Sequence, residues 1–127
     1  MAEAEYRATD VGVPISRLSE CIMETIEDME THKLYGPIVG HVGDGNFHVQ
    51  LMVDPKIKEE VDTANAFLER LAHRAINMDG TCTGEHGVGQ GKKQYLIDEL
   101  GPAVDFMKLI KQEIDPKGIM NPGKILQ

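Results

Sequence analysis

Two histidines on either side of a predicted tight turn are the first residues whose spacing points to chemistry. Asp44-Gly45 lies midway between His41 and His48, and Asp-Gly between apolar runs predicts a two-residue β-hairpin with a type I′ turn. Counting outward from this turn places His41 directly opposite His48. Cβ atoms of opposed residues in an antiparallel pair lie about 5 Å apart, so both imidazoles could bind one metal ion. We therefore predict that His41 and His48 are metal ligands.

A glycine-rich run at 84–89 holds a carboxylate and a further imidazole. Two imidazoles and one carboxylate leave coordination positions open for a substrate oxygen, so Glu85 is predicted as the third ligand. The adjacent His86 projects differently and would be free to move a proton. Phosphate binding by this run is not supported, because a Walker A loop requires Gly at position 86 and Ser or Thr at position 93.

Structural roles compete with these assignments. Histidines on strands are often only packed or hydrogen-bonded, but three of them in two glycine-flanked runs favour ligation or catalysis. Asn46 lies two residues before His48 and could hydrogen-bond a substrate from the same strand face, or serve turn chemistry instead. The alternative function for the whole chain is a non-enzymatic metal- or ligand-binding module of ferredoxin-like fold.

Apolar periodicity and turn residues predict an α+β fold. Ser16 is expected to cap the first helix and Asp54-Pro55 to begin the longest one. The element order matches a ferredoxin-like split βαβ arrangement with an antiparallel sheet and extra C-terminal helices. The predicted elements are a strand at 10–15, a helix at 16–33, hairpin strands at 37–41 and 47–53, a helix at 54–80, a β-prone stretch at 81–83, and helices at 90–100 and 102–114.

Composition narrows the class of protein. The 127 residues suffice for one domain, and the net charge of −8 argues against a nucleic-acid partner. We expect no transmembrane segment and no secretory signal, since no apolar run reaches about 18 residues. Cys21 and Cys82 form no Cys-x-x-Cys motif and are expected to be reduced packing residues in an intracellular compartment.

Four runs of this sequence together resemble the C-terminal part of FAD-linked oxidases of the D-lactate dehydrogenase and glycolate oxidase subunit type. The cytochrome-linked D-lactate dehydrogenases are the most similar group. The runs occur in the same order as in that family, and they extend from Thr9 almost to the end of the chain. They are 9–18, 40–48, 80–89 and 120–126.

This resemblance implies roles for particular residues. In the family, the positions that match His41, His48 and Glu85 bind a divalent metal, here zinc, manganese or iron, and the position that matches His86 is the catalytic base. The implied reaction is FAD-dependent oxidation of a D-2-hydroxy acid to the 2-oxo acid, with D-lactate preferred and glycolate or D-2-hydroxyglutarate next.

The resemblance also implies partners that residues 1–127 do not contain. We expect this segment to be the substrate and metal domain, with FAD bound mainly by an N-terminal domain, in cis or in trans, that is absent here. Asn121 would lie at the boundary with that domain, and Arg7 is a weak candidate for binding the substrate carboxylate.

Activity and location follow from the same resemblance. The chain alone is expected to be inactive and prone to form homo-oligomers, and a cytochrome or quinone would accept the electrons. The expected compartment is the bacterial cytoplasm, with the mitochondrion as the alternative.

Overall fold

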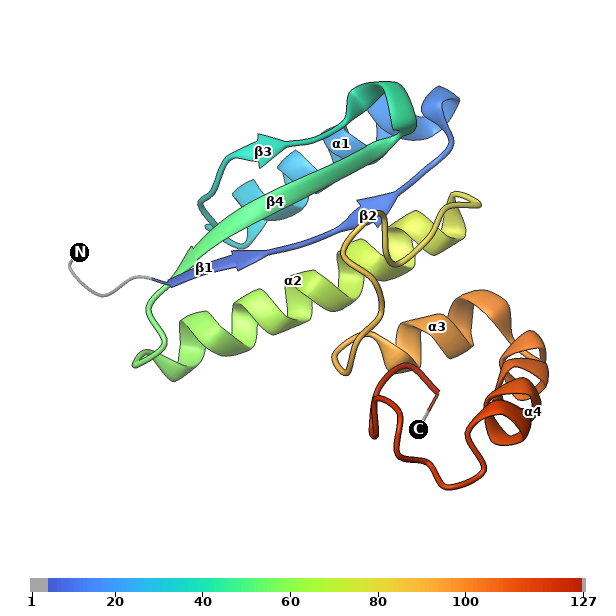
Figure 1. The fold of residues 1–127 in the computed structure, drawn as a ribbon. Helices are drawn as coiled ribbons and strands as arrows, with labels where there is room; N and C mark the ends of the chain where they lie inside the picture. The colour runs from blue at the N-terminus through green and yellow to red at the C-terminus, as the bar shows by residue number, and fades with distance from the viewer. Residues whose placement is uncertain (1–4, 127) are drawn as a thin grey trace. The chain divides into compact units, whose positions relative to one another are not determined.

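The computed structural model describes residues 5–126, which form two compact units divided between Glu85 and His86. The first unit holds the strands and two long helices, and the second holds two shorter helices (Figure 1). No helix in the described part of the chain combines the length and the apolar character that a membrane crossing requires.

An antiparallel sheet centred on β4 (Asn46–Val53) is the framework of the first unit. β1 (Glu5–Ala8) and β2 (Val11–Gly12) follow one another along one edge of β4 in a single register. β3 (Ile38–Val39) pairs with the other edge.

A further antiparallel bridge joins Gly12 to Thr81, beyond β2. If β1 and β2 are counted as one strand, the order across the sheet is Thr81, β1 with β2, β4 and β3. In chain order these are the fourth, first, third and second strands, which is the order of a split βαβ fold. The predicted α+β class is confirmed, with the fourth strand reduced to a single bridge.

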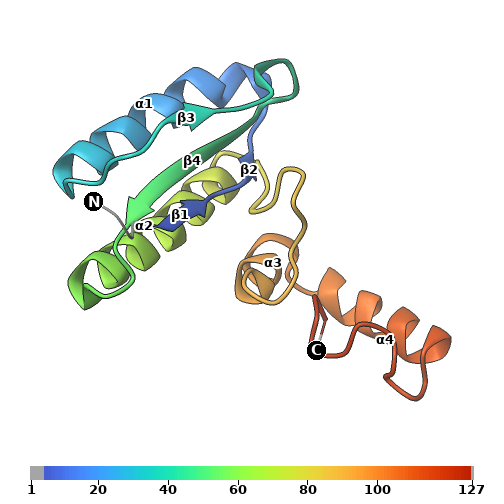
Figure 2. The same cartoon turned by 60° about the vertical axis from the view of Figure 1, so that its left-hand side comes forward.

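Helices α1 (Ile15–Thr31) and α2 (Lys58–Asn77) both cover one face of this sheet (Figure 2). Successive side chains of a strand point to opposite faces, so the odd-numbered residues of β4 face the helices and the even-numbered ones face away. Both cysteines are buried, as predicted. The core consists of Val11, Val13, Leu18, Cys21, Met29, Phe47, Val49, Leu51, Val53, Ala64, Phe67, Leu71, Ala75 and Met78.

The predicted two-residue hairpin is wrong in its register. β3 places Val39, not His41, opposite His48, and a 3₁₀ helix η1 (Val42–Asp44) widens the connection. Gly45 does adopt a positive φ of 73°, but its carbonyl accepts the N–H of Val13, 2.9 Å away. This contact with the chain segment after β2 overrides the local turn preference of Asp-Gly.

Both predicted helix starts also need correction. α1 begins at Ile15 without a side-chain cap, so Ser16 is not its N-cap. α2 begins at Lys58, because Asp54-Pro55 instead forms a turn in which the Asp54 carboxylate accepts the N–H of Lys56.

The second unit consists of α3 (Lys93–Leu100), α4 (Ala103–Ile114) and the segment that follows them. These are the predicted extra C-terminal helices. The carboxylate of Asp115 accepts the N–H groups of Ile119 and Met120 at 3.1 and 2.9 Å. It thereby ends α4 and turns the chain back.

A buried carboxylate joins the two long helices of the first unit. Asp28 on α1 accepts hydrogen bonds from Arg70, at 2.6 Å from Nη2, and from Arg74, at 2.8 Å from Nη2. Burial alone would raise the pKa of Asp28, but the hydrogen bonds from the two guanidinium groups outweigh it. The pKa therefore lies below the ordinary value of 3.8.

Replacing Asp28 should destabilise the fold in a pH-dependent way. Asp28→Asn is expected to lower the free energy of unfolding at pH 7 by about 2–3 kcal/mol, less than the roughly 3–5 kcal/mol for breaking a fully buried ion pair, because Arg70 is partly exposed. A depressed folded-state pKa stabilises the protein above the unfolded pKa. The difference between wild type and variant should therefore shrink as the pH falls below about 4. Urea denaturation at several pH values measures this.

Glu24→Gln is the matched control, because the half-exposed Glu24 carboxylate also pairs with Arg74, at 3.4 Å. It should change stability by less than about 1 kcal/mol. Equal effects of the two substitutions would contradict the assignment of Asp28 as the cross-helix anchor.

Candidate metal and substrate site

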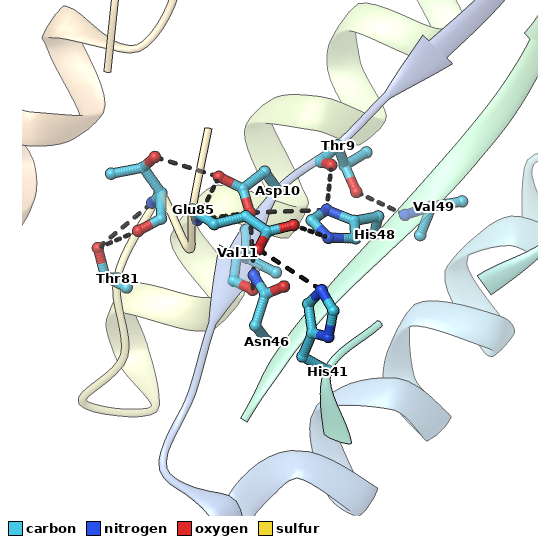
Figure 3. Close-up of polar contacts among 10 residues, drawn as sticks. Thr9, Asp10, Val11, His41, Asn46, His48, Val49, Thr81 and Glu85 are labelled. Carbon is cyan, nitrogen blue, oxygen red and sulfur yellow. Dashed lines mark hydrogen bonds and ion pairs between the residues drawn. The ribbon is translucent and has the colours of Figure 1, made fainter. Parts of the chain in front are cut away.

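The candidate site lies on the face of the sheet that the helices leave open. Asn46 and His48 are even-numbered residues of β4 and share this face, and Asp10, between β1 and β2, lies beside them (Figure 3). All three side chains are buried nonetheless. The loop from Thr81 to Glu85 approaches this face and covers them.

A local break in the β-ladder orients His48. The N–H of Val49 donates to the hydroxyl of Thr9, at 2.7 Å, instead of to the Thr9 carbonyl. The freed carbonyl lies 3.0 Å from Nδ1 of His48. A carbonyl oxygen can only accept, so Nδ1 carries the proton and Nε2 presents a lone pair.

Glu85 brings the two predicted histidine ligands together. Its Oε1 lies 3.1 Å from Nε2 of His48, and its Oε2 lies 3.6 Å from Nε2 of His41 (Figure 3). The three predicted ligands thus converge, although not by the direct opposition of His41 and His48 that the hairpin predicted. The shared neighbour is a carboxylate from a loop 37 residues further along the chain than His48.

The contact between His48 and Glu85 requires a proton or a cation between the two groups. Nε2 of the neutral imidazole and a carboxylate oxygen are both acceptors, and two acceptors 3.1 Å apart repel each other. Either a second proton on His48 or a cation between the groups satisfies them. This arrangement suits a divalent metal.

Asp10 is a residue of this site that the sequence reasoning missed. Its carboxylate accepts the N–H of Glu85 at 3.1 Å from both oxygens, and the side-chain amide of Asn46 at 2.9 Å. It is 2% exposed. The sequence did offer a signal for Asp10, because it is an acidic residue directly before the apolar strand run at 11–13 and aspartate is depleted in strands.

A pocket of about 470 Å³ opens beside these groups. Asn46 lines it and is 7% exposed, and its Nδ2 is already used by Asp10 and by the carbonyl of Val11. Within residues 5–126, the buried Oδ1 of Asn46 has no hydrogen-bond partner. A buried unsatisfied acceptor in a residue that lines a pocket indicates a missing donor. The polar side chains of the lining are His41, Asp44, Asn46, Asp79, Thr81 and Glu85.

The other three predicted site residues are described by the unit that holds them: Arg7 belongs to the first unit, and His86 and Asn121 belong to the second. Arg7 lies on the helix-covered face and donates from Nη1 to Asn65 on α2 at 2.7 Å. His86 is the first residue of the second unit, bonded to Glu85 through the chain. Asn121 lies in the exposed segment after α4 with a φ of 47°, and its carbonyl accepts the N–H of Lys124.

Comparison with known proteins connects this chain to one family. Residues 1–125 match the family described as FAD linked oxidases, C-terminal domain. The chain is 54% identical over 121 residues to a probable mitochondrial D-lactate dehydrogenase of Danio rerio, covering 94% of this chain and 24% of that protein. It is 51% identical over 125 residues to the mitochondrial D-lactate dehydrogenase [cytochrome] 1 of Saccharomyces cerevisiae, covering 98% and 21%.

A bacterial relative has a different name. The glycolate oxidase subunit GlcD of Bacillus subtilis is 34% identical over 117 residues, which cover 91% of this chain and 25% of that protein. The chain therefore spans between a fifth and a quarter of the length of these curated relatives.

Removing the Thr9 hydroxyl should disturb His48. Thr9→Val keeps the shape but leaves the buried N–H of Val49 without its acceptor, so we expect a loss of about 1–3 kcal/mol of stability. The Thr9 carbonyl should turn toward Val49, and the ring ¹⁵N shifts of His48 should report a lower population of the Nδ1–H form. Thr63→Val, which removes an exposed hydroxyl on α2, should stay within about 0.5 kcal/mol and leave these shifts unchanged.

A methyl group at position 84 should displace the loop that carries Glu85. A Cβ there would lie 1.7 Å from Nδ2 of Asn46 and 2.6 Å from Oδ1 of Asp10. Gly84→Ala is expected to cost about 1–3 kcal/mol in urea denaturation, as overpacking does. Gly43→Ala is the control, since a Cβ there meets nothing within 4 Å. Equal stability of the two variants would show that the loop is not packed on Asn46.

Proposed function

The chain belongs to the FAD linked oxidases, as their C-terminal domain, and from this premise we propose that it is the substrate and metal domain of an FAD-dependent D-2-hydroxy-acid dehydrogenase. D-lactate is the preferred substrate, and the product is the 2-oxo acid. The observation that carries the proposal is the convergence of Glu85 on His41 and His48. The printed names of the relatives support the substrate class.

His41, His48 and Glu85 would hold the divalent metal. Their donor atoms are two imidazole nitrogens and a carboxylate, a set that suits zinc, manganese or iron. The close approach of two acceptors, Nε2 of His48 and Oε1 of Glu85, supports a cation in this position. When bound, such an ion supplies Lewis acidity toward the hydroxyl and carboxylate oxygens of a substrate.

Asn46 would orient the substrate through its carbonyl oxygen. Because Asp10 and Val11 occupy the Nδ2 group, the acceptor Oδ1 is the atom of this amide left without a hydrogen-bond partner. An acceptor selects a ligand that donates, such as the hydroxyl of a 2-hydroxy acid, over the corresponding 2-oxo acid. Asn46 would therefore hold the hydroxyl group of the substrate on binding and release the product; because the hydroxyl has a single proton, its hydrogen bond to Oδ1 must break before that proton passes to His86.

His86 would be the general base. A neutral imidazole near pH 7 can accept the hydroxyl proton, and the peptide bond to Glu85 ties His86 to the metal ligands. The flavin, held by the remainder of the enzyme, supplies the hydride acceptor. Loss of the proton to His86 and of the hydride from the carbon leaves the carbonyl of the 2-oxo acid.

The remaining assignments concern partners of the domain. We propose that a flavin-binding part approaches the open face of the sheet, with Asn121 at the boundary, and that a cytochrome or a quinone accepts the electrons. The Arg7 side chain is engaged by Asn65 on the opposite face, so the substrate carboxylate would be bound by other groups. The mitochondrion is the compartment that the relatives' names favour.

A chimaeric enzyme tests this function. Replacing the matching segment of the Saccharomyces cerevisiae relative with this chain should preserve D-lactate-dependent dye reduction. In this background His86→Gln should lower kcat by at least about 100-fold, as expected for a lost general base, and leave the metal content unchanged. His48→Ala should remove both activity and metal, measured by elemental analysis. His73→Ala, on α2 away from the site, should alter neither.

The outcomes separate the candidate functions. An inactive chimaera whose domain still binds one divalent ion would support the non-enzymatic metal-binding module instead. Negligible metal in both the wild type and His48→Ala would show that the histidines are structural.

A further inference from the structure

We infer that Asp10 is the positioning residue of this site, whose buried carboxylate sets the arrangement of the metal ligands and of Asn46. The inference rests on the proposed function. Asp10 lies in the run 9–18, but the sequence alone assigned it no role in the site.

Asp10 connects three segments that are distant in the sequence. It lies between β1 and β2, it accepts from Asn46 on β4, and it accepts from the loop that ends at Glu85 (Figure 3). The hydroxyl of Thr83 adds a further hydrogen bond from that loop, at 3.2 Å. The loop position therefore depends on this carboxylate, because hydrogen bonds to an ionised acceptor are about twice as strong as neutral ones.

The same carboxylate influences the protonation of His48. Oδ1 of Asp10 lies 3.6 Å from Nδ1 of His48. A negative charge at this distance favours the proton on Nδ1, where the Thr9 carbonyl also accepts it. Nε2 is then left as the lone pair that faces Glu85. Such outer partners of a ligating imidazole fix its tautomer and its orientation.

The surroundings of Asp10 require an acceptor that has no hydrogen of its own. The N–H of Glu85, the amide of Asn46 and the hydroxyl of Thr83 all donate to it. An asparagine at position 10 has nearly the same shape, but it would point its own NH₂ group at one of these donors. Asp10→Asn is therefore the sharpest variant.

The experiment combines a metal titration with amide hydrogen exchange. In Asp10→Asn the affinity of the chain for Co²⁺ should fall by about 10- to 100-fold, as for other outer partners of ligating residues. The amide of Glu85, without its charged acceptor, should exchange at least about tenfold faster, whereas the amides of β4 should keep their rates. Asp44→Asn is the control, because it also removes one carboxylate charge, here from the pocket lining. It should change neither the Co²⁺ affinity nor the exchange rate of the Glu85 amide by more than about threefold.

The two readouts keep the inference and the proposed function distinguishable. Unchanged Glu85 exchange and unchanged Co²⁺ affinity in Asp10→Asn would overturn the inference, as would an equal loss of affinity in Asp44→Asn. A wild-type chain that binds no Co²⁺ would overturn the metal site, while the exchange of the Glu85 amide would still decide the role of Asp10. If Asp10→Asn does not fold, Thr83→Val takes its place and should accelerate this exchange by about threefold. An unchanged rate there contradicts the inference.

Discussion

The alternation of side chains along β4 is the constraint on which the rest of this structure depends. With both long helices on one face of the sheet, each odd-numbered residue of the strand must be apolar and each even-numbered residue is available for other purposes. The strand places Phe47 and Val49 in the core while Asn46 and His48 face the other way. Core and site are thus interleaved along one strand, and a shift by one residue would exchange them.

Burial of polar groups on the open face creates the chemistry of the site. The loop that ends at Glu85 removes Asp10, Asn46 and His48 from water, and each must then find hydrogen-bond partners within the protein. Most of these groups find one. Nδ1 of His48 donates to the Thr9 carbonyl, which the break in the β-ladder leaves free, and the amide of Asn46 donates to the Asp10 carboxylate. What remains is an unsatisfied carbonyl oxygen of Asn46 and a pair of acceptors facing each other. The first requires one hydrogen-bond donor, and the second requires either a further proton or a cation.

The ion-pair network between α1 and α2 has a different purpose from the charges of the site. Asp28 meets two guanidinium groups, so its charge is compensated by side chains of the chain itself. On the open face Glu85 meets two imidazoles, which compensate it only if they are protonated. The first cluster is complete without a ligand, whereas the second depends on protonation or on a cation.

The amino-acid sequence by itself determined the α+β class, the helices and the residue types capable of ligation, because these follow from local periodicity and side-chain chemistry. It also indicated the family, through four runs whose order is preserved. It did not determine the hairpin register, since the Gly45 carbonyl accepts the N–H of Val13, which is distant in the sequence, in addition to the contact of the Gly45 N–H with Val42 inside the turn. Only the tertiary structure decided that Glu85 lies between His41 and His48 and that Asp10 holds the loop, because both depend on contacts between segments that no local pattern connects.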